Sequence, residues 1–236
     1  MDRLTPNEWL LAAAAATVLI WQIPSGQLLL FPFTMLAIWF HEMCHGLAAM
    51  LLGGRFTRLD LEARGAGAAH YTVDVSGGRL GRALVAAAGP LGPPLAGAGL
   101  LWAGRDPTSG HWTLIGLGAV LVFSGLWWVR SLFGWLFVFA TGAALVALAH
   151  FADPAIQTFA LQFLGVQACI STFRQIRYLF TREVKIGNKL MLSDTGQIAH
   201  WLFGPHWIWG GLMSAVTVGI LLWSLRDALP VSFSLS

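Results

Sequence analysis

The sequence predicts an all-α polytopic membrane protein, with about six to seven transmembrane helices and a small cytoplasmic β-hairpin after the second span. Of its 236 residues, 56% are hydrophobic and only 11% are charged, whereas soluble domains average about 25% charged residues. The charges cluster and leave apolar stretches of roughly 20 residues, the length that crosses a bilayer as a helix. This composition excludes a soluble enzyme, a nucleic-acid binder and a disordered chain.

Seven apolar segments are long enough to be read as spans, and together they predict one membrane-embedded domain over residues 1–236. They are 9–24, 28–52, 83–103, 112–129, 131–152, 155–178 and 206–225. The first segment could be a signal peptide, but a span is favoured because the rest of the chain is itself apolar. The sixth carries Gln157, Gln162, Gln167 and Arg174, so we expect it to wall a polar site.

The basic residues predict an orientation. If the spans alternate and the N-terminus is cytoplasmic, all but Arg105 and Arg226 of the 14 Lys and Arg lie on the cytoplasmic side, as the positive-inside rule requires. We therefore expect a multi-pass protein of the plasma membrane with its N-terminus in the cytoplasm.

Three segments between or within the spans carry local signals. Residues 55–80 alternate apolar and polar side chains in two runs separated by glycines, which predicts a hairpin insert. A short helix is expected over 194–203, ended by Gly204-Pro205. The Gly- and Pro-rich stretch 89–94 predicts a local break in the third span.

The second span contains the motif H-E-x-x-H, as His41-Glu42-Met43-Cys44-His45. Residues i and i+4 share one face of a helix, so both imidazoles can bind one zinc ion, and Glu42 can serve as the general base. From this composition, roughly 0.003 such matches are expected by chance. Ionisable groups in a span are costly unless they are paired or bound to metal, and Cys44 points off the ligand face and is expected to pack.

Catalytic zinc sites generally use three protein ligands, so a third is needed. The candidates are Asp194, Asp74, His70, His200 and His206. Asp194 follows Ser193 at the start of the expected short helix, where both residue types are also good N-caps. The residues alone leave the ligand and cap roles of Asp194 open. His70 could lie at a cavity mouth, but a surface strand position is favoured.

These motifs resemble the site-2 protease superfamily of intramembrane zinc metalloproteases. The resemblance rests on His41-Glu42-x-x-His45 in a span, Gly53-Gly54 after it, the hairpin, and a later Asp. The match is closer to a compact branch in which a Ser-Asp pair precedes a short helix and a Pro-His-Trp segment, here Ser193-Asp194 and Pro205-His206-Trp207. The resemblance implies His41, His45 and Asp194 as ligands of one Zn²⁺ per chain, and Glu42 as the catalytic base.

The sequence also departs from the better-known branches of this superfamily. Ser193-Asp194-Thr195 stands where those branches carry Leu-Asp-Gly, and Pro93 stands where they carry an Asn that contacts the substrate. Gln167 and Asn188 are candidate substitutes for that Asn, although either could simply bridge helices.

The expected activity is hydrolysis of a membrane protein or peptide substrate within or near the bilayer, with no nucleic-acid partner. A substrate strand unwound from a helix could add to the edge of the 57–75 hairpin. The alternative is a zinc-binding membrane protein without proteolysis, such as a transporter or a regulatory relative, but the chain shows neither a lost Glu nor the internal repeats of a transporter. Hydrolysis of a non-peptide membrane substrate is a third option.

Overall fold

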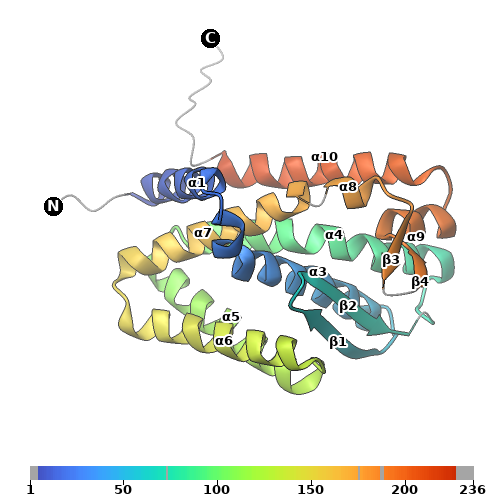
Figure 1. Cartoon of the computed structure of the whole chain (residues 1–236), viewed down its shortest axis with the longest axis horizontal. Helices are drawn as coiled ribbons and strands as arrows, with labels where there is room; N and C mark the ends of the chain where they lie inside the picture. The colour runs from blue at the N-terminus through green and yellow to red at the C-terminus, as the bar shows by residue number, and fades with distance from the viewer. Residues whose placement is uncertain (1–4, 73, 175, 187–188, 227–236) are drawn as a thin grey trace, which may run out of the picture.

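The computed structural model describes residues 5–72, 74–174, 176–186 and 189–226, in which seven long helices form a bundle and one of them carries the H-E-x-x-H segment (Figure 1). The long helices are α1 (Pro6–Gln22), α3 (Phe31–Leu51), α4 (Gly78–Ala103), α5 (Pro107–Trp127), α6 (Leu132–Phe151), α7 (Pro154–Arg174) and α10 (His206–Leu225). The short ones are α2 (Gly26–Leu29), α8 (Ile176–Leu179) and α9 (Asp194–Trp201). Strands β1 (Phe56–Glu62) and β2 (Ala66–Tyr71) form one antiparallel hairpin, and β3 (Glu183–Ile186) and β4 (Lys189–Leu192) form another.

The all-α polytopic architecture is confirmed. Five helices of the described chain are long and apolar enough to cross a membrane: α4, α5, α6, α7 continued to Leu179, and α10. Helix α3 has 21 residues, but His41, Glu42 and His45 lower its hydropathy. The sixth expected segment is helical, and Gln157, Gln162 and Gln167 are buried within the bundle. Gln167 lines a cavity together with His41 and Glu42, as expected of a segment that walls a polar site.

The expected alternation of the first two spans is wrong, because α1 and α3 run in the same direction. Along α1, Trp9 packs on Phe159 and Thr17 accepts a hydrogen bond from Gln167, so α1 runs parallel to α7. Phe33 at the start of α3 packs on Phe163, and His41, further along α3, faces Tyr178 just beyond α7. Helix α1 therefore starts at the end of the molecule opposite the hairpins (Figure 1), away from the basic segments.

The predicted first hairpin is confirmed, and one of its two edges is occupied. The N–H of Leu59 donates to the carbonyl of Trp128, and the carbonyl of Leu59 accepts the N–H of Arg130. The Ser131 hydroxyl accepts the N–H of Leu61 and donates to its carbonyl. The α5–α6 connection thus covers the outer edge of β1. Because β1 is covered there, the accessible edge of this hairpin is that of β2.

Two features of the fold differ from the sequence expectations. Helix α4 continues through Pro90, Pro93 and Pro94 without the predicted break. The β3–β4 hairpin was not predicted, and it leads directly into α9, which begins at Asp194 but ends at Trp201 instead of residue 203. Hydrogen bonds from the Ser193 hydroxyl to Thr181 O and from the Thr195 hydroxyl to Leu179 O hold the start of α9 inside the bundle.

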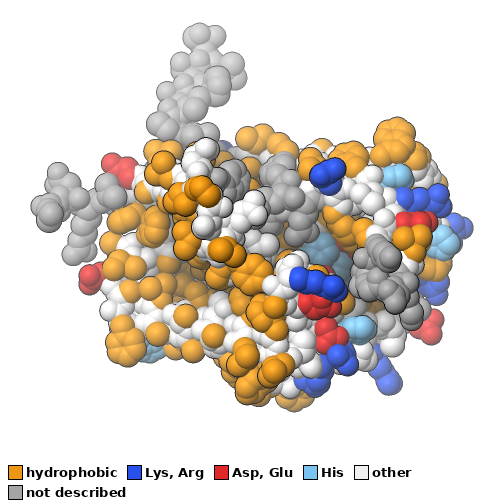
Figure 2. Space-filling model, in the orientation of Figure 1, with side chains coloured by type: hydrophobic (Ala, Val, Ile, Leu, Met, Phe, Trp, Pro, Cys, Tyr) orange, Lys and Arg blue, Asp and Glu red, His pale blue; other side chains and the backbone are white. Residues whose placement is uncertain are grey.

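Charged side chains concentrate at the end that carries the hairpins, while most of the remaining surface in this view is hydrophobic (Figure 2). The described arginines on the elements of this end are Arg55, Arg58, Arg64, Arg79, Arg82, Arg130, Arg177 and Arg182. Arg105 and Arg226 line one small cavity at the opposite end, between α4 and α10. The two ends therefore differ in charge, as the sequence predicted.

Candidate metal centre

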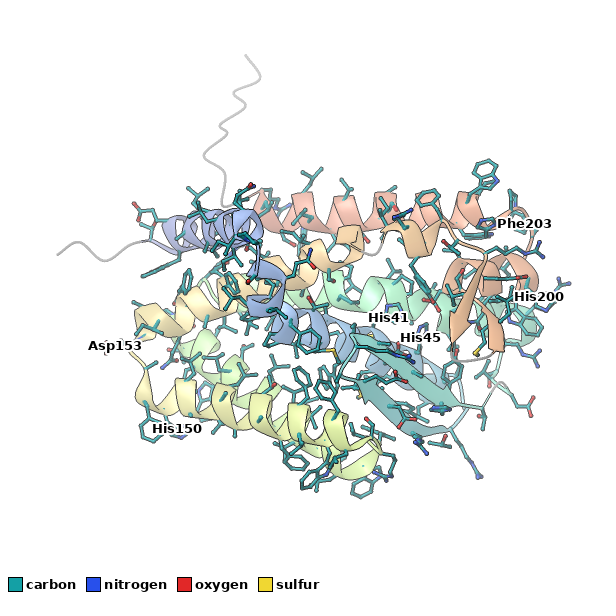
Figure 3. All side chains as sticks on the ribbon, viewed as in Figure 1. His41, His45, His150, Asp153, His200 and Phe203 are labelled. Atoms are coloured by element: carbon teal, nitrogen blue, oxygen red, sulfur yellow. The ribbon has the colours of Figure 1, made fainter. Side chains whose placement is uncertain are left out.

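His41 and His45 lie one turn apart on α3 and face the same cavity (Figure 3). Their Nε2 atoms are 3.2 Å apart. The Nδ1 atom of the buried His45 lies 2.8 Å from the carbonyl oxygen of Val85 on α4. Since a carbonyl can only accept, Nδ1 carries the proton and the lone pair of Nε2 points to the cavity, as a metal ligand requires.

Asp194 is brought to the two histidines by the start of α9. Its Oδ2 atom lies 3.1 Å from His41 Nε2, and its Oδ1 atom lies 3.3 Å from His45 Nε2. The helix cap is supplied by the neighbouring residue, because the Ser193 hydroxyl accepts the N–H of Gly196. Within the described residues, His41, His45 and Asp194 form the single cluster of three His, Cys, Asp or Glu side chains close enough to share a metal ion.

The donor set fits a zinc ion. Ligand atoms at a tetrahedral Zn²⁺ with bonds of about 2.0–2.1 Å are separated by about 3.3 Å. The two Nε2 atoms are 3.2 Å apart, and each lies 3.1–3.3 Å from one of the two carboxylate oxygens of Asp194. Burial by itself would raise the pKa of the Asp194 carboxyl, but the neighbouring imidazoles of His45 and His41 hold that pKa below its usual range. The Oδ2 atom of Asp194 is buried, and no aligned hydrogen bond reaches it from the described part of the chain. A cation would satisfy this oxygen and both imidazole lone pairs.

The other four candidates for the third ligand are not part of this cluster. The Asp74 side chain is exposed and lies 3.8 Å from Arg82. His70 contacts Asp60 at 3.1 Å, and His206 contacts the carbonyl of Phe180. His200 packs its ring on Trp201. His70 and His200 both line the larger cavity, so His70 is at once a strand residue and a residue of the cavity wall.

Glu42 is held beside the ligands by the accessible edge of β2. Its Oε2 atom accepts the backbone N–H of Ala69 at 2.8 Å. A Cβ atom at Gly67 would lie 2.8 Å from Glu42 Cγ and 2.7 Å from Ile38 Cγ2. The close approach of β2 to α3 therefore explains the glycine at position 67.

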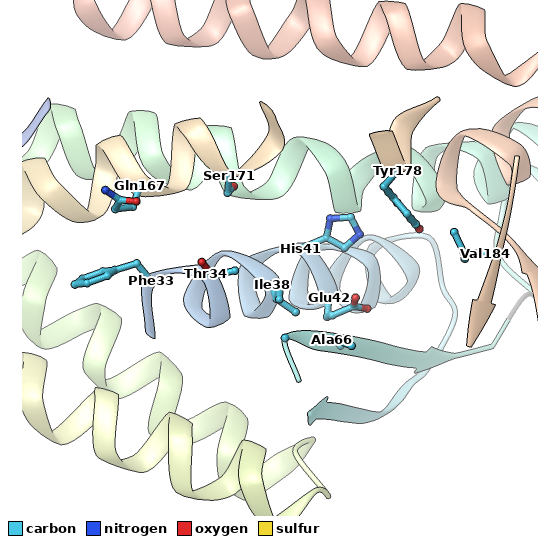
Figure 4. A pocket seen from close by; sticks show the side chains of 12 residues that line it. Phe33, Thr34, Ile38, His41, Glu42, Ala66, Gln167, Ser171, Tyr178 and Val184 are labelled. Carbon is cyan, nitrogen blue, oxygen red and sulfur yellow. The ribbon is translucent and has the colours of Figure 1, made fainter. Parts of the chain in front are cut away.

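Two cavities meet at the site. The smaller, of about 400 Å³, extends along α3 and α7 toward Phe33, Thr34 and Gln167 (Figure 4). The larger, of about 630 Å³, lies between the two hairpins and is lined by His70, Thr72, Gln197 and His200 among others. Five residues line both cavities and define their junction: His41, Glu42, Gly67, Tyr178 and Val184.

Gly89 on α4 makes room for the His45 ring. A Cβ atom there would lie 2.1 Å from His45 Nε2 and 2.3 Å from its Cε1 atom. We expect Gly89→Ala to displace the imidazole and to weaken zinc binding about 10- to 100-fold, the range seen when the support of a ligand is lost. Titration of the purified variant with a competing zinc indicator measures this change.

Gly99 provides the control on the same helix, because a Cβ atom at that position meets nothing within 4 Å. Gly99→Ala should bind zinc as tightly as the unmodified chain. Equal zinc affinity in the Gly89→Ala variant would contradict the placement of His45.

The sequence reasoning missed the two tyrosines at the site. The ring of Tyr71 is stacked on His45 at 6.1 Å between centroids, and the ring of Tyr178 meets His41 edge-on at 6.4 Å. Burial raises the pKa of Tyr71 above its ordinary range, so its hydroxyl stays protonated. Of the two expected polar substitutes, Gln167 donates to the Thr17 hydroxyl at 2.6 Å, and Asn188 lies outside the described residues.

The family model of Peptidase M50B-like proteins matches residues 10–224, which is most of the chain. The chain belongs to this family. The M50 family comprises zinc metalloproteases of membranes, so the resemblance to the site-2 protease superfamily is confirmed. No curated protein and no solved structure matches the chain.

Proposed function

We propose that this M50B-like protein is an intramembrane zinc metalloprotease that hydrolyses peptide bonds of membrane-associated substrates within or near the bilayer. The observation that carries the proposal is the meeting of His41, His45 and Asp194 beside Glu42, at the junction of two cavities. One cavity extends between the apolar helices and the other lies among the hairpins. A membrane segment and its flanking chain could therefore occupy the site together.

His41, His45 and Asp194 would hold one zinc ion, and Glu42 would act as the general base. When bound, zinc supplies Lewis-acid polarisation of the scissile carbonyl and lowers the pKa of a water molecule. Glu42 takes a proton from the attacking water as the water oxygen bonds to the carbonyl carbon. The C–N bond then breaks, and Glu42 returns the proton to the leaving amine. The products are a carboxylic acid and an amine, and transfer of the acid proton to the amine gives a carboxylate and an ammonium group.

The edge of β2 is suited to hold the substrate in an extended form. Leu59 and Leu61 turn their backbone groups away from β2, and their register partners are Ala69 and Gly67. In an antiparallel ladder, both residues of such a pair point outward, so the N–H and C=O groups of Gly67 and the C=O group of Ala69 face the cavities, while the N–H of Ala69 donates to Glu42. An unwound substrate strand could pair with them, which would compensate for the lost hydrogen bonds of its helix.

The charge distribution supports a cytoplasmic position for the end that carries the hairpins, by the positive-inside rule. Because α1 starts at the opposite end, the start of α1 would then lie on the non-cytoplasmic side. The substrate would be a membrane protein or peptide that reaches the site from the bilayer.

Chelation tests the metal dependence of this function. Purified protein in lipid nanodiscs should cleave a fluorogenic membrane-segment reporter, and dipicolinic acid should abolish cleavage by removing zinc. Added Zn²⁺ should restore cleavage. Isophthalic acid, which lacks the chelating ring nitrogen, serves as the matched control and should have no effect.

A zinc-loaded protein that cleaves no peptide in any membrane-segment reporter would contradict proteolysis. Such a result would favour a zinc-binding protein without this activity. Cleavage that persists after complete zinc removal would contradict the metal mechanism instead.

A further inference from the structure

Only two of the 236 residues are tyrosines, against 15 Phe and 12 Trp, and both pack on the candidate zinc-binding histidines. Aromatic packing in the rest of the described bundle uses rings without a phenolic hydroxyl. A Phe ring would fill the same space beside His41, so packing alone does not explain why residue 178 carries a hydroxyl.

Tyr178 and Glu42 line the same cavity, and in the view of Figure 4 His41 lies above Glu42 and to the left of Tyr178. Its hydroxyl oxygen accepts the backbone N–H of Asp194 at 3.3 Å. A hydroxyl that accepts in this way still has its own proton to donate. Tyr178 is also one of the five residues that line both cavities. A chain that passes from one cavity to the other must therefore pass Tyr178.

The position of Tyr178 relative to Asp194 is fixed by hydrogen bonds of the two residues that flank Asp194, Ser193 and Thr195. The carbonyl of Leu179, the next residue, accepts the Thr195 hydroxyl at 2.8 Å. The carbonyl of Arg182 accepts the N–H of Ser193 at 2.9 Å. The segment that carries Tyr178 and the start of α9 therefore form one bonded unit, in which the hydroxyl is held in place before a substrate arrives.

We infer that Tyr178 is a catalytic residue that donates a hydrogen bond to the oxygen of the scissile carbonyl as that oxygen gains negative charge. The site needs such a donor, because Pro93 stands where the better-known branches carry Asn and the amide of Gln167 is engaged by Thr17. A donor that is already oriented toward the developing charge lowers the barrier without further reorganisation. This inference rests on the proposed peptide hydrolysis.

The test is Tyr178→Phe, which keeps the ring and removes the hydroxyl. We expect kcat to fall about 100-fold or more, as when one oxyanion donor is lost, with KM changed less than about twofold. Zinc content and unfolding temperature should match those of the unmodified protein. The affinity for a phosphinic pseudopeptide with the sequence of the reporter should fall by a factor similar to kcat, because its tetrahedral group resembles the transition state.

Other outcomes overturn the inference. A kcat within threefold of the unmodified value shows that the hydroxyl does not stabilise the transition state. Loss of zinc from Tyr178→Phe assigns Tyr178 to positioning Asp194 instead. A loss of activity confined to Tyr71→Phe transfers the role to the other tyrosine.

Thr217→Val removes a buried hydroxyl of α10 away from the site and serves as the unaffected control. If the unmodified protein cleaves no reporter, the proposed function fails, and the pseudopeptide affinity still tests Tyr178.

Discussion

Replacing Glu42 with Gln is expected to lower the rate of reporter hydrolysis by about 10²- to 10⁴-fold, the range associated with loss of a general base. The variant should retain one zinc per chain, because Glu42 is not among the three clustered ligand atoms. The local structure should also be retained, since the amide oxygen of Gln can still accept the N–H of Ala69. Cleavage rates and elemental analysis of the same preparation measure both quantities.

Glu62→Gln is the matched control for this substitution. Glu62 lies at the end of β1 and pairs with Arg64 on the exposed turn of the hairpin, so its loss of charge should leave the cleavage rate unchanged. A Glu42→Gln protein that hydrolyses the reporter within threefold of the normal rate would rule out Glu42 as the base.

Asp194→Asn is expected to weaken zinc binding by more than about 100-fold, beyond the loss typical of residues that only support a ligand. The substitution keeps the shape of the side chain and removes its negative charge, which faces His41 and His45 at 3.1 and 3.3 Å. At a fixed free zinc concentration, the unfolding temperature should fall toward that of the metal-free form, because the stabilisation by a ligand decreases with the logarithm of the ratio of its concentration to its Kd. Zinc titration and thermal unfolding measure the two effects.

Ser193→Ala separates the ligand from the helix cap. This variant loses the hydrogen bonds of the hydroxyl with the N–H of Gly196 and with the carbonyl of Thr181. The loss of the cap should lower stability by about 1 kcal/mol, while the bond from the Thr195 hydroxyl to Leu179 O still holds the start of α9 and the variant keeps its zinc. If Asp194→Asn binds zinc normally and Ser193→Ala does not, the assignment of roles to these two residues is wrong.

The ligands on α3 could be predicted from sequence because their geometry is local. His41 and His45 are four residues apart, and any helix places them on one face. Asp194 was one of five candidates by residue type, since its approach to α3 depends on the tertiary packing of α9. The resemblance to a family favoured it, and the structure brings it to the histidines. Tyr178 belongs to no local motif, so its place at the site follows only from the packing of α8.

The helices and strands, like the site residues, could be predicted from the sequence only where the signal is local. The alternating runs of β1 and β2 predicted their hairpin, and the second hairpin had a comparable signal in Gly187-Asn188 between two short apolar-polar runs. The direction of α1 could not be obtained from hydropathy, because the alternation of spans assumes that each apolar segment crosses the bilayer in turn. The connection through α2 instead returns the chain, so that α1 and α3 both run parallel to α7.

The candidate ligands come from elements that are distant in the sequence, α3 and α9. A shared ion would therefore act as a removable cross-link that closes a long loop of the chain, and such closures restrict the unfolded ensemble more as the loop grows. Helix α9 is short, so much of its hold on α3 would come from that ion. The folded lifetime of the protein would then depend on the free zinc concentration of its compartment, and metal starvation would destabilise the protein as well as stop its chemistry.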